Sequence, residues 1–154
     1  MSIYLRNQTL IKEAVVATSS QSELILKLVA LHTKIQKQIA GPLSFHGISF
    51  TEYLVLRQLH AAPENKMRRI DLAQQVGLSA SGVTRLLNPM EKVGLISKEE
   101  APRDARVSLV TITSAGETIF SDADASFAQV AQSVMQSLSG EDQKSLSRLT
   151  GLLL

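Results

Sequence analysis

The chain has no cysteine and no tryptophan among its 154 residues, and aromatic residues make up only 4% of it. Without cysteine there is no disulfide, no thiol nucleophile, no thiol redox sensor and no cysteine-ligated metal. No apolar run approaches the roughly 18 residues of a membrane span. Arg6, Lys12 and Glu13 interrupt the apolar residues near the N-terminus, which argues against a secretory signal. We therefore expect a cytoplasmic protein without a membrane partner.

Patterns for catalysis and metal binding are also missing. No motif pairs a serine with a histidine and a carboxylate, and there is no glycine-rich phosphate loop, so we expect no enzyme. The histidines, His32, His46 and His60, are scattered without tight acidic clustering, so we expect no metal site and no cofactor. His60 ends a predicted helix and is expected to interact with the helix dipole.

The residues that are present describe a globular protein with a basic middle section. Hydrophobic content is 44%, and the length fits one domain, or one globular unit with extra helices that need a partner. The net charge is only +2, but residues 66–106 hold eight Lys/Arg against five Asp/Glu. This excess is a weak indication of a polyanionic partner.

Two helices are predicted before residue 63. The first covers residues 22–39, ends at Gly41-Pro42 and carries an apolar stripe of Leu24, Leu28, Leu31, Ile35 and Ile39. The second starts at the capping box Ser49–Glu52 and stops near Ala62-Pro63. Its apolar residues are Tyr53, Leu54, Leu56 and Leu59.

A helix-turn-helix is predicted next. Residues 70–76 form a short helix with Ile70, Ala73 and Val76 facing inward, and Gly77 ends it in a left-handed conformation. Only Leu78 separates this glycine from Ser79, the N-cap of the following helix. Two helices joined by so short a turn are typical of the motif.

The hydrophobic period changes after Leu95, which predicts a β-hairpin. LISKEE and RVSLVTIT are strands around the charged turn APRDA, and Val107, Leu109 and Thr111 alternate with Ser108 and Val110. A capping box at 114–117 then opens one further helix, and Ser139-Gly-Glu-Asp142 caps a last one. The apolar stripe of the first is Phe120, Ala123, Phe127, Val130, Val134 and Leu138, and the second carries Leu146, Leu149, Leu152 and Leu153.

The fold class that follows is mainly α with a small β-hairpin wing, a winged helix-turn-helix flanked by dimerisation helices. We assign residues 1–48 to an N-terminal helical dimerisation region, 49–113 to a DNA-binding domain and 114–154 to C-terminal dimerisation helices. The long helices carry more apolar surface than a small winged domain can cover, which favours a homodimer.

The predicted recognition helix, residues 79–92, has two different faces. Val83, Leu86, Leu87 and Met90 lie inward. The outer, groove-facing residues are Ala80, Ser81, Gly82, Thr84, Arg85 and Asn88. A helix fits the major groove, and these small or hydrogen-bonding side chains suit close approach to DNA. For Gly82 the alternative is close packing against the neighbouring helix.

Specific roles follow for four side chains of this helix. Arg85 is expected to read guanine O6 and N7, although a solvated or phosphate-paired arginine is the alternative. Ser79, Ser81 and Thr84 are expected to hold phosphates near the positive end of the helix dipole.

The wing turn, residues 101–106, contains Arg103, Asp104 and Arg106. An arginine at a hairpin tip can enter the minor groove, with Asp104 orienting Arg106 through an ion pair. The alternative is an exposed charged turn of little energetic value.

Pro89 interrupts the recognition helix. It lacks an N–H, which leaves the carbonyl of Arg85 without its helical partner, so we predict a bend or break near Asn88-Pro89 and a separate turn at 90–93. The alternative is a tolerated helix end.

Residues 70–116, IDLAQQVGLSASGVTRLLNPMEKVGLISKEEAPRDARVSLVTITSAG, resemble the MarR family of bacterial winged-helix transcription regulators. The resemblance is carried by Leu72-Ala73, Gly77-Leu78-Ser79, Val83-Thr84-Arg85-Leu86, Glu91 to Leu95, Asp104-x-Arg106, Thr113 and Gly116. Pro89 and Gly82 depart from the family pattern.

The resemblance implies an obligate homodimer that reads a pseudo-palindrome in double-stranded DNA. It also implies a regulator, most often a repressor, that a small aromatic or anionic effector releases from DNA. From their placement, candidate effector-binding residues are His32, Phe45, His46, Tyr53 and Arg57. The competing interpretation is a winged-helix protein-interaction module without specific DNA binding, which would have no need to keep residues 85, 103 and 106 basic.

Overall fold

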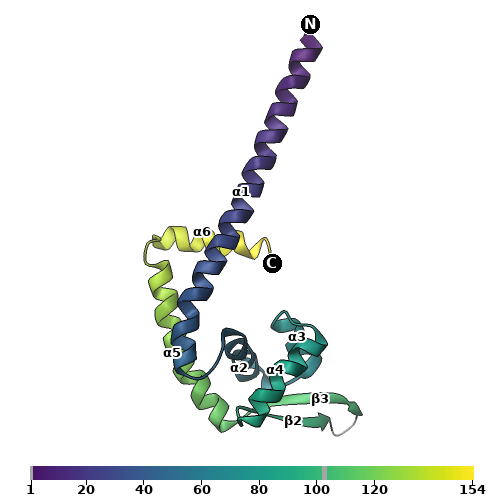
Figure 1. Cartoon of the computed structure of the whole chain (residues 1–154), viewed down its shortest axis with the longest axis vertical. Coiled ribbons are helices and arrows are strands. Elements are labelled where there is room, and N and C mark those ends of the chain that lie inside the picture. Colours follow the sequence, from purple (N-terminus) through teal and green to yellow (C-terminus); the bar gives the residue numbers. More distant parts are fainter. Residues whose placement is uncertain (1, 102–103) are drawn as a thin grey trace. The chain divides into compact units, whose positions relative to one another are not determined.

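The computed structural model describes the backbone of residues 2–101 and 104–154, and the side chains of residues 20–99 and 108–154. The chain forms two compact units, residues 1–37 and residues 38–154. The first unit is a stretch of the long helix α1 (Ser2–Phe45), and the remaining elements belong to the second (Figure 1). None of the described helices is long and apolar enough to cross a membrane.

The prediction that the first helix ends at Gly41-Pro42 was wrong. α1 continues through Pro42 to Phe45. Ile39 and Leu43 are buried in the second unit, with 4% and 0% of their surface exposed. Burial of these two side chains offsets the hydrogen bond that a proline removes from a helix. The chain then leaves the helix at Gly47, whose φ of +76° suits glycine.

Helix α2 (Phe50–Ala61) begins and ends as predicted. Ser49 accepts a hydrogen bond from the backbone N–H of Glu52, and the Glu52 carboxylate accepts one from the N–H of Ser49. Its buried residues are Tyr53, Val55, Leu56 and Leu59. The helix stops before Pro63, which opens a short 3₁₀ turn, η1 (Pro63–Asn65).

Helices α3 (Arg69–Gln75) and α4 (Ala80–Lys92) form the predicted helix-turn-helix. Gly77 has a φ of +69°, and the N–H of Leu78 donates to the carbonyl of Ala73, which closes the turn. The prediction for the inward face of α3 was wrong at Ile70, which is 60% exposed, because Leu72 takes the buried position beside Ala73.

The wing is a three-stranded antiparallel sheet of order β1-β3-β2. β2 (Ile96–Ala101) and β3 (Asp104–Ile112) are the predicted hairpin, and β1 (Lys66–Arg68) pairs with β3 at residues 109–111. Sequence patterning missed β1 because three residues, Lys-Met-Arg, carry no apolar alternation. The alternation of Val107, Leu109 and Thr111 does not mark the core face of β3, because Val110 and Ile112 are its buried residues.

Helices α5 (Ser114–Met135) and α6 (Gly140–Gly151) complete the fold. The N-cap of α5 is Thr113 rather than the predicted Ser114, since the Thr113 hydroxyl accepts from the N–H of Gly116. Ser139 caps α6 as predicted. Of the predicted stripe, Phe120 and Ala123 are buried, Phe127, Val130 and Val134 are half-buried, and Leu138 is half-buried but lies after the end of α5.

The core of the second unit lies where the helix-turn-helix and the sheet meet α2 and α5. Its fully buried side chains include Tyr53, Leu56, Leu72, Leu87 and Val110. This core holds α4 by one face and leaves the other to solvent. The predicted class, mainly helical with a small antiparallel sheet, is confirmed.

Candidate nucleic-acid interface

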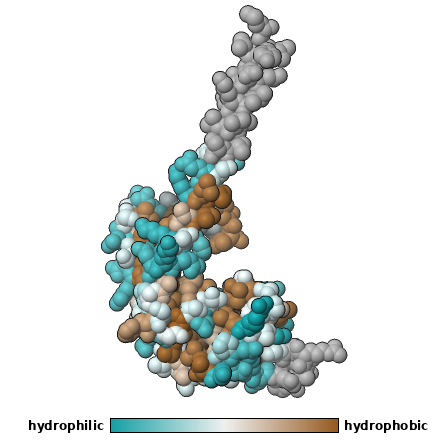
Figure 2. Space-filling view, in the orientation of Figure 1, coloured by the Kyte–Doolittle hydropathy of each residue, from teal (hydrophilic) through white to brown (hydrophobic). Residues whose placement is uncertain are grey.

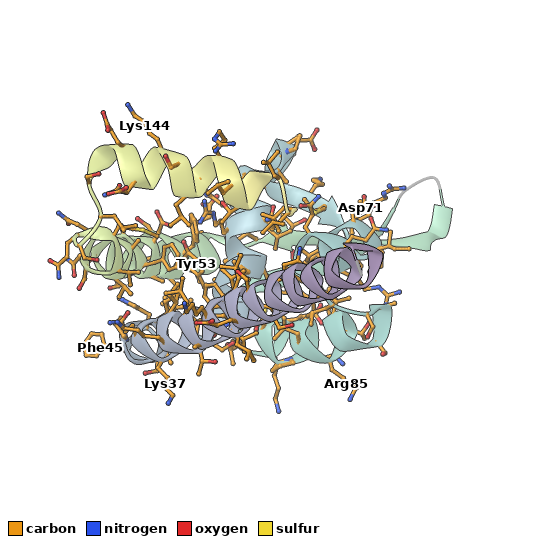
Figure 3. The ribbon with its side chains drawn as sticks, turned by 90° about the horizontal axis from the view of Figure 1, so that it is seen from above. Lys37, Phe45, Tyr53, Asp71, Arg85 and Lys144 are labelled. Carbon is orange, nitrogen blue, oxygen red and sulfur yellow. The ribbon has the colours of Figure 1, made fainter. Side chains whose placement is uncertain are left out.

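α4 divides into the two faces that its sequence predicts. Val83, Leu87 and Met90 are fully buried, while Leu86 is only half-buried. Of the six predicted groove-facing residues, four are exposed, namely Ala80, Ser81, Arg85 and Asn88. The other two, Gly82 and Thr84, are half-buried. Figure 3 shows Arg85 pointing outward from this helix. Among the described side chains no carboxylate pairs with Arg85.

The N-terminus of α4 is already capped by the chain itself. The Ser79 hydroxyl oxygen accepts from the N–H of Gly82 at 3.1 Å and lies 3.2 Å from the hydroxyl oxygen of Ser81. A Cβ placed on Gly82 would come within 3.1 Å of the Ser79 hydroxyl oxygen and 3.7 Å of the Leu78 Cβ. Tight packing against the cap is therefore a structural reason for this glycine, close to the alternative weighed from the sequence.

Arg69, the first residue of α3, reaches across to the recognition helix. One of its terminal nitrogens, Nη1, donates to the Thr84 hydroxyl at 2.7 Å, and that hydroxyl in turn donates to the carbonyl of Ala80 at 2.8 Å. The Thr84 hydroxyl thus has its proton engaged within the helix. In the sequence Arg69 is one cation of the basic middle section, and no local pattern places it beside the groove-facing residues of α4.

Lys98 of β2 connects the wing to the C-terminal half of α4. Its ammonium donates to the Asn88 side-chain oxygen at 2.7 Å and lies 2.8 Å from a carboxylate oxygen of Glu91. The Lys98 side chain is 21% exposed, whereas Asn88 is open to solvent. Because the contact joins residues ten positions apart on a strand and a helix, helical periodicity does not reveal it.

Of the predicted bend or break at Pro89, the break and the separate turn after it were wrong, and the bend stays a prediction. α4 is continuous from Ala80 to Lys92 with Pro89 inside it, and Met90 to Lys92 remain in the same helix. Arg85 and Pro89 are both exposed, so water can reach the Arg85 carbonyl that proline leaves without its helical partner. Full burial of Met90 holds the last turn against the core.

The wing tip lies partly outside the described residues. Arg103 is not described, and Asp104 and Arg106 are described only as backbone in β3. The ion pair between Asp104 and Arg106 and the insertion of an arginine into the minor groove stay predictions.

Two of the five candidate effector-binding residues form contacts between α2, its preceding loop and α5. The His46 Nε2 atom lies 2.8 Å from the Ser126 hydroxyl oxygen, and the Tyr53 hydroxyl donates to the Asp124 carboxylate at 2.6 Å. Burial, the hydrogen bond to Asp124 and the charge of that carboxylate raise the pKa of Tyr53 to about 12, while Arg57 acts in the opposite direction.

Phe45 and Arg57 lie beside these two residues. Phe45 is 88% exposed, with its ring centroid 5.8 Å from that of His46, and Arg57 is exposed and acts on the Tyr53 hydroxyl through its charge and a hydrogen bond. His32 belongs to the first unit. The Tyr53 ring is itself enclosed by a stack of aromatic rings from α2 and α5, with centroids 5.0 Å from Phe127 and 5.9 Å from Phe120. His60 completes this stack at 4.8 Å from Phe120.

The second unit of this chain is a winged helix-turn-helix: two helices joined by a tight turn, a three-stranded wing, and an exposed face on the second helix. The model of the MarR family matches residues 46–107, which include the helix-turn-helix, β2 and the start of β3. Over these residues the chain is similar to the MarR family.

A curated relative and solved structures are also similar to this chain. The HTH-type transcriptional regulator PrsX of Escherichia coli is 25% identical over 97 residues, which cover 62% of this chain and 58% of that protein. The chain thus spans less than two thirds of the length of this relative.

Two similar structures were solved with DNA. Sco3205, a MarR family transcriptional regulator from Streptomyces coelicolor in complex with DNA, has a TM-score of 0.80 at 20% identity, covering 87% of this chain and 86% of that one. A mutant of MarR from Escherichia coli complexed with operator DNA has a TM-score of 0.76 at 21% identity, covering 83% and 91%. These chains share the fold described above.

Proposed function

We propose that this protein is a homodimeric regulator of transcription that binds double-stranded DNA, with α4 in the major groove and the wing at the minor groove. The observation that carries the proposal is the exposed face of α4. It offers an arginine without a described carboxylate partner and small neighbours, Ala80, Ser81 and Gly82, that do not obstruct a close approach to base edges. Two structures with this fold were solved in complex with DNA or operator DNA, which supports the same partner here.

Contacts to the DNA backbone and to the bases are assigned to different residues. Arg85 reads a base, since its bidentate guanidinium fits guanine O6 and N7. Ser81, in the first turn of α4, and Arg69, which contacts that half of the helix, hold phosphates. These contacts set the orientation of the helix on DNA. Arg103, Asp104 and Arg106 form the wing contact.

Dimerisation follows from apolar surface that the single chain leaves exposed. Leu26 and Val29 of α1 are 68% and 56% exposed, and Leu152 and Leu153 after α6 are 73% and 74% exposed. Brown areas in Figure 2 mark apolar side chains that remain at the surface. A soluble domain rarely keeps so many large apolar residues exposed without a partner, and a second copy places two α4 helices on two half-sites.

Repression is the sign of regulation that we assign, with release by a small aromatic or anionic effector. We propose the effector site at the contacts of His46 and Tyr53 with α5, because polar side chains meet an aromatic stack there. An effector that separates these rings would alter how α2 and α5 pack, and α2 packs against the helix-turn-helix.

The test is binding to the DNA upstream of the protein's own gene and to a scrambled fragment of the same length, across a salt series. We expect tighter binding to the upstream fragment, with the logarithm of the affinity falling by about 0.9 per phosphate contact for each unit of log salt. R85A should lose discrimination between the fragments worth about 1–3 kcal/mol. K144A is the matched control, since Lys144 is an exposed cation on α6 (Figure 3) and should leave discrimination unchanged.

Equal and weak binding to both fragments, repeated with fragments selected from the whole genome, would contradict the proposal. It would favour the protein-interaction module that the sequence left as the alternative.

A further inference from the structure

The contact between Lys98 and Asn88 controls which hydrogen-bonding groups the recognition helix offers. Lysine carries three donors and no acceptor, so the atom of Asn88 that faces it must be the amide oxygen rather than the amide nitrogen. The orientation of the Asn88 amide, which is often ambiguous, is therefore decided by its partner.

Glu91 keeps Lys98 in this place. The ammonium lies between the Asn88 oxygen at 2.7 Å and the Glu91 carboxylate at 2.8 Å, and both residues belong to α4. Only 21% of the Lys98 side chain is exposed, while Asn88 is on the solvent side of the helix. The wing thus supports an exposed amide that is already oriented before DNA arrives.

We infer that Lys98 is a specificity-determining positioning residue, which makes Asn88 select an acceptor edge such as guanine rather than adenine. This inference rests on the proposed function and deepens it. It concerns only the base that Asn88 meets in the major groove.

The reason lies in the donors and acceptors of the two purines. An asparagine reads adenine by accepting from its N6 amine through the amide oxygen and donating to N7 through the amide nitrogen. Here one of the two lone pairs of that oxygen accepts from an ammonium, so an incoming amine would place a second donor next to a cation. Guanine presents O6 and N7, two acceptors, which match the two donors of the Asn88 amide nitrogen and the remaining donor of Lys98.

The experiment is selection from a pool of randomised DNA duplexes with the full-length protein, followed by sequencing of the bound fraction. The position at which N88A loses its base preference identifies the base that Asn88 meets. At that position we expect wild type to favour guanine over adenine by about tenfold or more. K98M, which keeps the length of the buried stem, should bring this ratio close to one.

Two variants separate positioning from charge. K98R retains a donor for the Asn88 oxygen and should keep the guanine preference. K92M removes an equivalent positive charge from the last turn of α4, where Lys92 is exposed and has no carboxylate partner among the described side chains, and should also keep it. Thermal unfolding of each variant verifies that the fold is intact.

An adenine preference in wild type, an unchanged preference in K98M, or no position altered by N88A would overturn the inference while the proposed function stands. If no form of the protein enriches any sequence, the proposed function itself fails, and the inference fails with it.

Discussion

At the scale of single residues, two polar side chains of α4 form hydrogen bonds with residues of another element. Thr84 and Asn88 look like free polar residues in the sequence, yet Arg69 and Lys98 engage them from positions 15 and 10 residues away. Which faces of α4 are buried could be predicted from a period of 3.6 residues. Which of its exposed groups are already hydrogen-bonded could not, because those partners come from α3 and β2.

Tyr53 gives a prediction about pH at this scale. Its pKa is about 12 in the folded chain against 10.0 ordinarily, so the folded state holds the phenolic proton more tightly than the unfolded state does. This contribution to the free energy of unfolding is fully present below pH 10 and is lost as the pH rises from 10 towards 12. Urea unfolding across this range should show a steeper loss of stability in wild type than in Y53F.

The two proteins must be compared at each pH, because lysines also titrate in this range. If stability fell equally with pH in wild type and Y53F, burial and Asp124 would not raise the pKa of Tyr53.

At the scale of elements, the starts of helices were largely predictable because a cap needs only three or four neighbouring residues. Ser49, Ser79 and Ser139 all cap as predicted. The exception is α5, where the cap moves to Thr113 because its hydroxyl also donates to the carbonyls of Gly94 and Leu95. Hydrogen bonds to residues 18 and 19 positions away thus decide which of two adjacent residues caps the helix.

Both prolines inside helices were misjudged for a related reason. Pro42 and Pro89 interrupt helical hydrogen bonding locally, but each is followed directly by a fully buried residue, Leu43 and Met90. The gain from burying these side chains is set by neighbouring elements and is absent from any local rule.

Gly116 of α5 packs against Leu95, the residue before β2, and against Ile112, the last residue of β3. A Cβ at this position would lie 2.1 Å from the Leu95 carbonyl oxygen and 2.8 Å from an Ile112 side-chain carbon. G116A should therefore lower the free energy of unfolding by about 1–3 kcal/mol or more, as overpacking does. Chemical denaturation measures the loss.

G41A is the matched control, because Gly41 lies inside α1 and an added Cβ meets nothing within 4 Å. It should raise stability by roughly 0.5–1 kcal/mol through helix propensity. If G116A were as stable as wild type, the close approach of α5 to the Leu95 backbone would be refuted.

At the scale of the whole molecule, the chain exposes more apolar surface than one copy needs. Leu24, Ile25, Leu26 and Val29 are each more than half exposed within one short stretch of α1. For a chain of 16.7 kDa, sedimentation equilibrium should therefore give twice this mass. The charged pair L26E/V29E should shift the protein towards monomers, because it places carboxylates in a face that a partner must cover.

K34E is the control for the added charge, since Lys34 is an exposed polar residue of the same helix. It should keep the dimer mass. A wild-type protein with the mass of one chain at micromolar concentrations would contradict the proposed dimer.

The order of the elements, the helix-turn-helix with its glycine turn and serine cap, and the solvent face of α4 could all be predicted from the amino-acid sequence. These features depend on hydrogen bonds and periodicities that span a few residues. Four other features arise only when the elements pack together. α1 and α4 continue through their prolines, Val110 and Ile112 face the core, β1 joins the wing, and Lys98 and Arg69 bind side chains of α4. Each of these depends on contacts between residues far apart in the chain, whose energies exist only once the elements have packed.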